Sequence, residues 1–138
     1  MDKSNKLIIA IGSNFNQREN IDYAKKHLSL ILGDDIAFSE EMWTAPIGIE
    51  SDKFINCLCV SATSHTYTQT ANALKHIEKK CGRTKKNDKE HKIPLDLDIL
   101  LFGSEKFHTD DWNREYVRKL IHNFEKEKEC FILDPITR

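Results

Sequence analysis

The order in which helical and strand-like segments alternate constrains the fold of this chain most. Residues 6–12, KLIIAIG, form a continuous apolar run, which is typical of a strand that is central in its sheet or covered on both faces. A helical repeat of apolar residues follows, made of Ile21, Ala24, Leu28 and Ile31. We expect this helix to begin with a capping box of Asn16 and Glu19 and to end at Gly33.

The rest of the chain continues this alternation. Residues 35–43 and 54–63 predict two more strands. Thr66 and Gln69 predict a second capping box. The helix that follows repeats Ala71, Leu74, Ile77 or Glu78, and Cys81, and is expected to end at Gly82. Beyond it we expect a basic loop over 83–92, a strand over 95–102, a polar helix or loop over 110–126 and a short final strand over 130–135.

This order, β-α-β-β-α-β, predicts an α+β protein with the ferredoxin-like arrangement. In such a fold an antiparallel sheet carries its helices on one face, which leaves the other face free to carry a site. The length of 138 residues suits one domain, which we place at 1–138.

Composition excludes some partners and says little about others. Charged residues make up 31% of the chain, but the net charge is only −1, which argues against bulk electrostatic capture of nucleic acid or membrane. Apolar runs all fall short of the roughly 20 residues of a membrane span, and the N-terminal run is too short for a secretory signal. We therefore expect a cytoplasmic protein. Cys57 and Cys59 share a strand face and are expected in the core.

Two aspartates stand inside the apolar stretch KIPLDLDILLFG. Asp96 and Asp98 are two residues apart, so in a strand both carboxylates leave the same face. Such carboxylates repel each other unless a cation lies between them, and Mg²⁺ is commonly held by one or two carboxylates together with substrate phosphates. The pair therefore indicates a magnesium–nucleotide site, and the alternative is the solvated outer face of an amphipathic strand.

A basic segment precedes the aspartates. Its positively charged candidates are Arg83, Lys85, Lys86, Lys89, His91 and Lys92. Basic groups beside metal-binding carboxylates suit a polyphosphate clamp, because they offset the charge on the phosphate oxygens. A solvated loop is the alternative interpretation.

The segment WTAPIGIESDKFIN predicts a third binding region. Thr44, Pro46 and Gly48 belong to a turn-rich loop whose backbone groups can point at a ligand. Phe54 and Asn56 share a face of the next strand, where a ring and an amide suit a flat, polar heterocycle. Each of these residues also has an ordinary structural explanation, as a core Phe and a turn Asn. The IGSN segment near the start is interpreted as a turn and not as a phosphate loop.

These segments occur in an order that resembles a known family. The segments AIGSNFNQRENIDYA, TAPIG, FIN, IEKKCGRTKK and LDLDILLFG, within residues 7–103, together resemble 6-hydroxymethyl-7,8-dihydropterin pyrophosphokinase, an enzyme of folate biosynthesis. CFILDP is a weaker match. The resemblance implies a ferredoxin-like fold and transfer of pyrophosphate from ATP to the pterin hydroxymethyl group, with release of AMP.

The resemblance also implies roles for individual residues. Asp96 and Asp98 would hold two Mg²⁺ ions. The pterin would be bound by Thr44, Pro46, Ile47, Gly48 and Asn56, between the rings of Phe54 and Phe131. ATP would be bound by Lys75, Glu78, Arg83, Lys85, Lys92, Ile99 and His122, of which Arg83, Lys85 and Lys92 are the catalytic candidates.

The chain departs from the family at its basic positions. The family usually has Arg where Ile93 stands, and often a second Arg where Lys85 stands. Glu129 occupies a position where a basic residue is expected. Lys keeps the charge of Arg but loses its planar fork, so the changes are not neutral.

Three functions are therefore weighed. The first is a Mg²⁺-dependent pterin pyrophosphokinase, a monomer or weak homodimer whose partners are ATP and the dihydropterin. The second is a relative that binds pterin or nucleotide without transfer. The third, a ferredoxin-like RNA-binding domain, lacks the aromatic-rich sheet motif that this class requires.

Overall fold

The computed structural model describes residues 4–33 and 35–133. In chain order its elements are β1 (Asn5–Ser13), α1 (Gln17–Leu32), β2 (Ala37–Phe38), β3 (Met42–Thr44), β4 (Phe54–Thr63), α2 (Tyr67–Lys80), α3 (Lys85–Lys89), β5 (Asp96–Phe102), β6 (Glu105–Lys106), α4 (Thr109–Trp112) and α5 (Glu115–Lys128). No helix among these residues is long and apolar enough to cross a bilayer.

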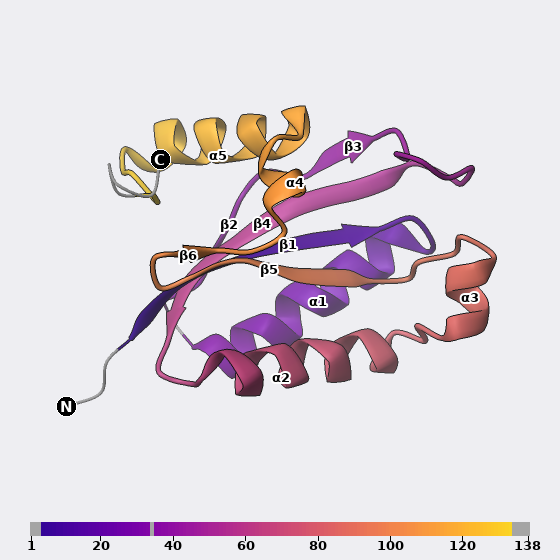
Figure 1. The fold of residues 1–138 in the computed structure, drawn as a ribbon, viewed down its shortest axis with the longest axis horizontal. Helices are drawn as coiled ribbons and strands as arrows, with labels where there is room; N and C mark the ends of the chain where they lie inside the picture. Colours follow the sequence, from indigo (N-terminus) through magenta and orange to yellow (C-terminus); the bar gives the residue numbers. More distant parts are fainter. Residues whose placement is uncertain (1–3, 34, 134–138) are drawn as a thin grey trace.

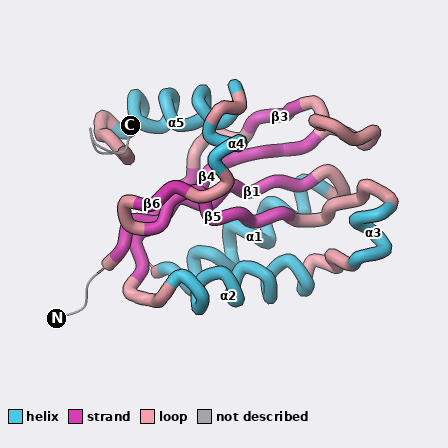
Figure 2. The backbone as a smooth tube through the Cα atoms, viewed as in Figure 1, coloured by secondary structure: helices cyan, strands magenta, loops and turns pink. Residues whose placement is uncertain are grey.

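One antiparallel sheet organises the molecule. Its strand order is β2-β4-β1-β5-β6, and β3 adds to β4 outside this path. β1 is central, because it pairs with β4 on one side and with β5 on the other. The expected α+β class and the β-α-β-β-α-β order are confirmed (Figures 1 and 2).

The helices lie on both sides of the sheet. α1 and α2 cover one face, as expected, and bury the odd-numbered residues of the central strands, including Cys57 and Cys59. The other face is not wholly free, because α5 packs across part of it through Val117, Leu120 and Phe124. The apolar spacing of α5 is that of a half-buried helix, and its packing makes three layers where two were expected.

The face beneath α5 changes character along the strands. Near α5 it is apolar, with Ile8, Leu58 and Leu100 in the core. Toward the end of β1 the even-numbered residues become small or polar, and the pairing sets Asn56 beside Gly12 and Gly12 beside Asp96. The candidate site therefore occupies the part of this face that α5 leaves open.

The helix ends agree with the sequence at α2 and differ at α1. Thr66 and Gln69 form the expected capping box, with each side chain bonded to the other residue's backbone. Asn16 makes no side-chain cap, because its backbone is left-handed (φ 47°) and directs the amide away from the first turn. Asn20 instead donates to the Phe15 carbonyl. The end of α1 at Gly33 is confirmed, although Ile31 is exposed and Leu32 packs in its place.

Three segments differ from expectation. The strand expected over 35–43 is two short strands. At the break the Ser39 N–H still donates to the Leu58 carbonyl, but the Leu58 N–H donates to the Ser39 hydroxyl in place of a backbone carbonyl. The loop expected over 83–92 contains α3, which is capped by the Thr84 hydroxyl. Residues 130–133 of the expected final strand are not a strand, and 134–135 lie outside the described residues.

Candidate functional site

Two cavities meet at the aspartate pair. The small cavity, of about 230 Å³, lies on the open part of the sheet face, and the large cavity, of about 760 Å³, lies between β5, α2 and α3. Asp96 and Asp98 line both, since their side chains leave β5 on the same face as expected. The two cavities are therefore joined at these carboxylates.

The small cavity has a floor of small residues and a wall of fixed polar groups. Ala10 and Gly12 form its floor, and Phe54 and Asn56 rise from β4 beside them. The Asn56 amide donates to the Thr44 hydroxyl at 2.5 Å, which holds the amide oriented. A Cβ on Gly12 would lie 2.9 Å from Asn56 Oδ1, so the amide position depends on this glycine.

Only some of the pterin candidates at the end of β3 and on the loop after it line the small cavity. Thr44 and Ile47 line it, together with Ile49. Pro46 and Gly48 are their direct neighbours in the loop but are not among the lining residues. Gly48 has a positive φ of 77°, a conformation that glycine adopts readily, so it shapes the turn that presents Ile47.

The large cavity is rich in cations. Lys75, Lys79 and Lys85 line it and make no ion pair with any described residue, so their charges are available to an anion. Glu78, Arg83 and Ile99, three further candidates for ATP binding, also line it. This distribution suits a ligand with several negative charges.

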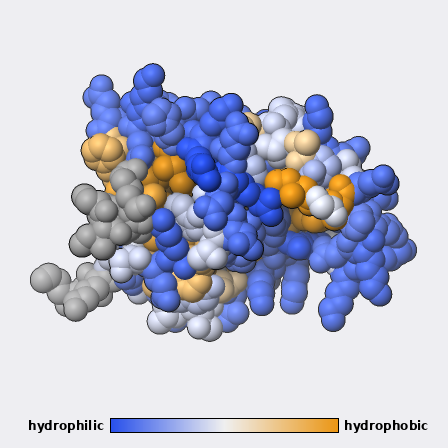
Figure 3. Space-filling model, turned by 45° about the horizontal axis from the view of Figure 1, so that its top comes forward, coloured by the Kyte–Doolittle hydropathy of each residue, from blue (hydrophilic) through white to orange (hydrophobic). Residues whose placement is uncertain are grey.

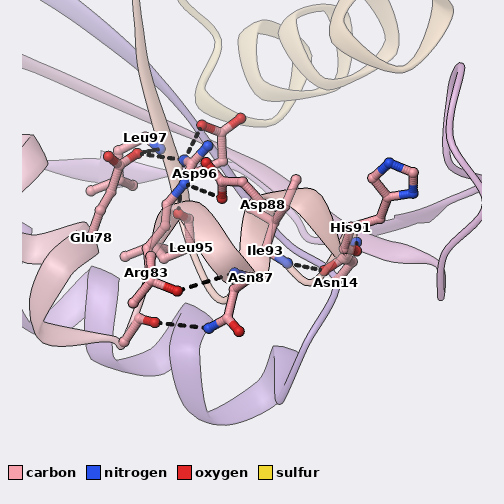
Figure 4. A network of polar contacts seen from close by, with 12 residues as sticks. Asn14, Glu78, Arg83, Asn87, Asp88, His91, Ile93, Leu95, Asp96 and Leu97 are labelled. Carbon is pink, nitrogen blue, oxygen red and sulfur yellow. Dashed lines mark hydrogen bonds and ion pairs between the residues drawn. The ribbon is translucent and has the colours of Figure 1, made fainter.

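Arg83 is held by three carboxylates, as Figure 4 shows. Its Nη1 donates to Asp96 at 2.8 Å and to Glu78 at 3.1 Å, and its Nε donates to Asp88 on α3 at 3.1 Å. Burial opposes the charge of Arg83, but the attraction of Asp96 outweighs it and raises the pKa of Arg83. Arg83 thus links α3 to the metal-ligand candidate Asp96.

Glu78 is a positioning residue as well as a lining residue. Its Oε2 accepts from the Leu97 backbone N–H at 2.8 Å, which ties α2 to the strand that carries the aspartates. Burial raises the pKa of Glu78, while this hydrogen bond and Arg83 act in the opposite direction.

The Asp98 carboxyl lies in a crowded negative region. Burial first, and then the nearby Asp96 charge, raise the pKa of Asp98 to about 8. His108 approaches this carboxyl, with its Nε2 3.7 Å from Asp98 Oδ1. This surrounding favours a cation beside Asp98.

Asn14 holds the segment that leads into β5. Asn14 is buried, its Nδ2 donates to the His91 carbonyl at 2.8 Å, and its Oδ1 accepts from the Ile93 N–H at 2.6 Å (Figure 4). The turn predicted for IGSN is therefore wrong for most of its length: residues 11–13 still belong to β1, and only Asn14 lies in the bend that leads to α1. Asn14 also places Ile93 against the small cavity. Its sequence signal was a lone Asn after a strand, which does not reveal a partner 77 residues away.

Three candidates lie away from the two cavities. Lys92 is exposed, lies 5.7 Å from the Phe15 ring centroid, and lines neither cavity. His122 is exposed on α5 and also lines neither. Phe131 is 79% exposed and is not among the residues that line the small cavity with Phe54.

Four residues near the aspartates were missed by the sequence interpretation. His108 lines the large cavity, and Asp111, Arg114 and Tyr116 line the small one. They lie in or directly before α4 and α5, and only the fold brings this segment over β5. The signal in the sequence was the cluster HTDDWNREY, which has the composition of an ordinary polar helix start.

The surface on this side is predominantly hydrophilic, with small apolar patches between polar groups (Figure 3). A third, open cavity of about 780 Å³ continues from the small one between β3 and α5, sharing Thr44, Ile47, Arg114 and Tyr116 with it.

Comparisons with known proteins identify the family of this chain. The family model described as 7,8-dihydro-6-hydroxymethylpterin-pyrophosphokinase (HPPK) matches residues 8–136. A folate synthesis bifunctional protein of Arabidopsis thaliana is 30% identical over 123 residues, which cover 80% of this chain. The match spans only 25% of that relative's length. The resemblance inferred from the ordered motifs is confirmed.

Proposed function

Because the chain belongs to the 7,8-dihydro-6-hydroxymethylpterin-pyrophosphokinase family, we propose that it transfers pyrophosphate from ATP to 6-hydroxymethyl-7,8-dihydropterin. The observation that carries this proposal is that two cavities of different character meet at Asp96 and Asp98. One suits a flat, neutral heterocycle and the other a polyanion. The products are the pterin diphosphate ester and AMP.

The small cavity binds the acceptor in this proposal. Its volume of about 230 Å³ suits a bicyclic heterocycle better than a nucleotide. The Asn56 amide, oriented by Thr44, offers a donor and an acceptor to the pterin edge, and the Phe54 ring packs against its plane. The hydroxymethyl group then points toward the aspartates.

The large cavity binds ATP. Lys75 and Lys85 contact phosphate oxygens, while Ile99 offers an apolar contact to the adenosine part. Arg83 exchanges Asp96 for a phosphate oxygen when ATP enters, because phosphate presents more negative charge than one carboxylate. Lys92 and His122 act only if their segments move toward the cavity.

Asp96 and Asp98 fit a magnesium site. Hard oxygen ligands on one strand face are the donors that Mg²⁺ prefers, and burial together with the neighbouring Asp96 charge raises the pKa of Asp98, so a bound cation would stabilise its ionised form. We propose that the two carboxylates hold two Mg²⁺ ions. When bound, these ions neutralise triphosphate charge and help align the reacting groups.

The reaction requires positioning more than covalent chemistry by the protein. The hydroxymethyl oxygen of the acceptor attacks the β-phosphorus, and the bond from that phosphorus to the oxygen that bridges it to the α-phosphorus breaks. AMP leaves with the bridging oxygen, and the hydroxyl proton passes to solvent. Arg83 and Lys85 offset the charge that spreads over the phosphate oxygens, and the fixed strands hold the acceptor in line.

A second candidate is a relative that binds pterin without efficient transfer. It is favoured by a specific observation: Ile93 places an apolar side chain against the small cavity, and Lys92 lines neither cavity. Binding of the pterin with micromolar affinity in a calorimeter, together with absent AMP release, would establish this candidate.

The decisive test measures AMP release from ATP by chromatography. We expect AMP to appear only with both the dihydropterin and Mg²⁺, and to disappear with a chelator. The assay is run with enzyme in excess of substrate, so that a slow single turnover is detected. Absence of pterin-dependent AMP under these conditions rules out the pyrophosphokinase proposal.

A further inference from the structure

A second set of metal-ligating side chains overlaps the aspartate pair. One ligand atom each from Asp98, His108 and Asp111 lies within 4.8 Å of the other two. His108 Nε2 and Asp98 Oδ1 are 3.7 Å apart, which is too long for a hydrogen bond. Cis ligands at ~2.1 Å from one octahedral ion lie ~3.0 Å apart and trans ligands ~4.2 Å apart, so a side-chain movement of about 1 Å or less brings these atoms to ligand spacing.

The position of this set is fixed by the fold. Trp112 anchors α4 to the sheet, because its indole N–H donates to the carbonyls of Leu100, at 3.1 Å, and Phe107, at 3.0 Å. Arg114 Nε donates to Asp111 Oδ1 at 3.1 Å, which orients that carboxylate and leaves its second oxygen for another partner. Asp111 is therefore preorganised over β5, and the anchored α4 fixes the backbone that follows His108.

The set also bridges the two cavities. His108 lines the large cavity, Asp111 lines the small one, and Asp98 lines both. Electrostatics favour a cation at this point, since two carboxylates converge there. Arg114 offsets the charge of Asp111 and Arg83 that of the neighbouring Asp96, but neither arginine pairs with Asp98.

We propose that His108 and Asp111 join Asp98 as protein ligands of one divalent cation, so that the chain binds this cation without nucleotide. The inference rests on the proposed function only in that Asp98 is shared with the proposed Mg²⁺ site. An imidazole ligand suits transition metals better than Mg²⁺, and carboxylates suit Mn²⁺. The site therefore prefers Mn²⁺ to Mg²⁺.

The test titrates the ligand-free full chain with Mn²⁺, following the paramagnetic resonance signal of free Mn²⁺. We expect one Mn²⁺ per chain, displaced by Mg²⁺ only at a concentration at least ~10-fold higher. His108→Gly should weaken Mn²⁺ binding by at least ~10-fold, and Asp111→Asn should do the same. Glycine is chosen because His108 has φ 53°, which glycine adopts without strain, so the backbone is preserved.

Matched controls are His65→Gly and Asp110→Asn, which change a remote histidine and the aspartate next to Asp111 outside the set. Both should bind Mn²⁺ like the wild type. Unchanged Mn²⁺ affinity in the folded His108→Gly variant overturns the proposal, as does a ligand-free chain that binds no Mn²⁺ at millimolar concentration. Displacement by Mg²⁺ at equal concentration overturns the stated preference.

The titration contains neither ATP nor pterin, so its result is independent of transfer. A chain that releases AMP but shows no His108-dependent Mn²⁺ binding disproves this inference alone. A chain that binds Mn²⁺ through His108 but releases no AMP disproves the proposed function alone.

Discussion

The small and large cavities share two aspartates and differ in almost everything else. The small cavity is built on β1 and β4, whose pairing register fixes Gly12 and Asn56 side by side. The large cavity is built mainly from α2 and α3, whose lysines are long and exposed. The small cavity therefore has a fixed surface with a hydrogen-bonded amide, whereas the large cavity is surrounded by exposed, charged side chains.

In the proposed reaction, this difference lets the chain select its two substrates by different means. A neutral ring system is selected by shape and by an oriented amide, which strands hold better than loops do. A polyphosphate is selected by charge, which tolerates mobile side chains because attraction to several anionic oxygens does not need one geometry. Mutations should therefore separate acceptor binding from donor binding, except at the shared aspartates.

The largest effect is expected where the cavities meet. Asp98→Ala removes a carboxylate that lines both cavities, and Asp96→Ala does the same for its partner. Each should lower the rate of AMP release by ~1,000-fold or more, because the charge of the phosphates is no longer offset by bound metal. Circular dichroism should show an unchanged fold. Asp110→Ala serves as the control. Full activity of the Asp96 or Asp98 variant would refute the proposal that the two substrates meet at these aspartates.

The next largest effect concerns the small cavity. Gly12→Ala places a Cβ within 2.9 Å of Asn56 Oδ1, so the amide must move. We expect the dissociation constant of the pterin to rise ~10-fold or more, as with Asn56→Ala, because a positioned hydrogen-bonding group is lost. The dissociation constant of ATP should change less than ~2-fold. Fluorescence titration measures both, Asn72→Ala is the control, and equal losses for both ligands would contradict the separation.

A smaller effect is expected in the large cavity. Lys85 lines it and Lys86 does not, so Lys85→Ala and Lys86→Ala form a matched pair. Lys85→Ala should weaken ATP binding ~3- to 10-fold, an effect that shrinks at high salt because the contact is electrostatic. Pterin affinity should not change. If Lys86→Ala weakens ATP binding equally, the large cavity is not the ATP site.

The smallest effect concerns the support behind the small cavity. Glu41 precedes β3 and is bound by Arg18 and Lys25 of α1 at 2.6 Å each. The hydrogen bond from Arg18 lowers the pKa of Glu41 from 4.5 to about 2. Because the folded pKa is lower, this stabilisation is complete above ~pH 4.5 and is lost as the pH falls toward 2.

Denaturant unfolding at pH 6 and at pH 2.5 measures this contribution. We expect Glu41 to supply about 1–2 kcal/mol at pH 6, less than the shift in pKa alone suggests, because Arg18 is 56% exposed and screened by water. Glu41→Gln should remove this site's contribution to the difference in unfolding free energy between pH 6 and pH 2.5, and Glu50→Gln should leave that difference unchanged. A wild-type chain and a Glu41→Gln chain with the same pH dependence would contradict the assignment.

Local sequence patterns predicted the elements whose determinants are local. The Thr66 capping box, the limits of β4 and the end of α1 at Gly33 follow from periodicity and from residues within one helical turn. The cap at Asn16 was predicted by the same rule and was wrong, because the turn after β1 puts this residue in a left-handed conformation. Thr84 is a residue type that commonly caps helices, so the start of α3 had a local signal. That signal was missed because the basic composition of the segment was interpreted as a loop.

The candidate site also combines features that local sequence predicts with features that only the fold determines. The same-face arrangement of Asp96 and Asp98, and of Phe54 and Asn56, needs only the period of a strand, so the sequence alone determined it. The ordered motifs likewise determined the family. What the tertiary structure alone decided is which distant groups meet these residues. Asn14 reaches Ile93 across the fold, and α4 brings His108 and Asp111 over Asp98. Such contacts depend on how separate elements pack, and no local period encodes that.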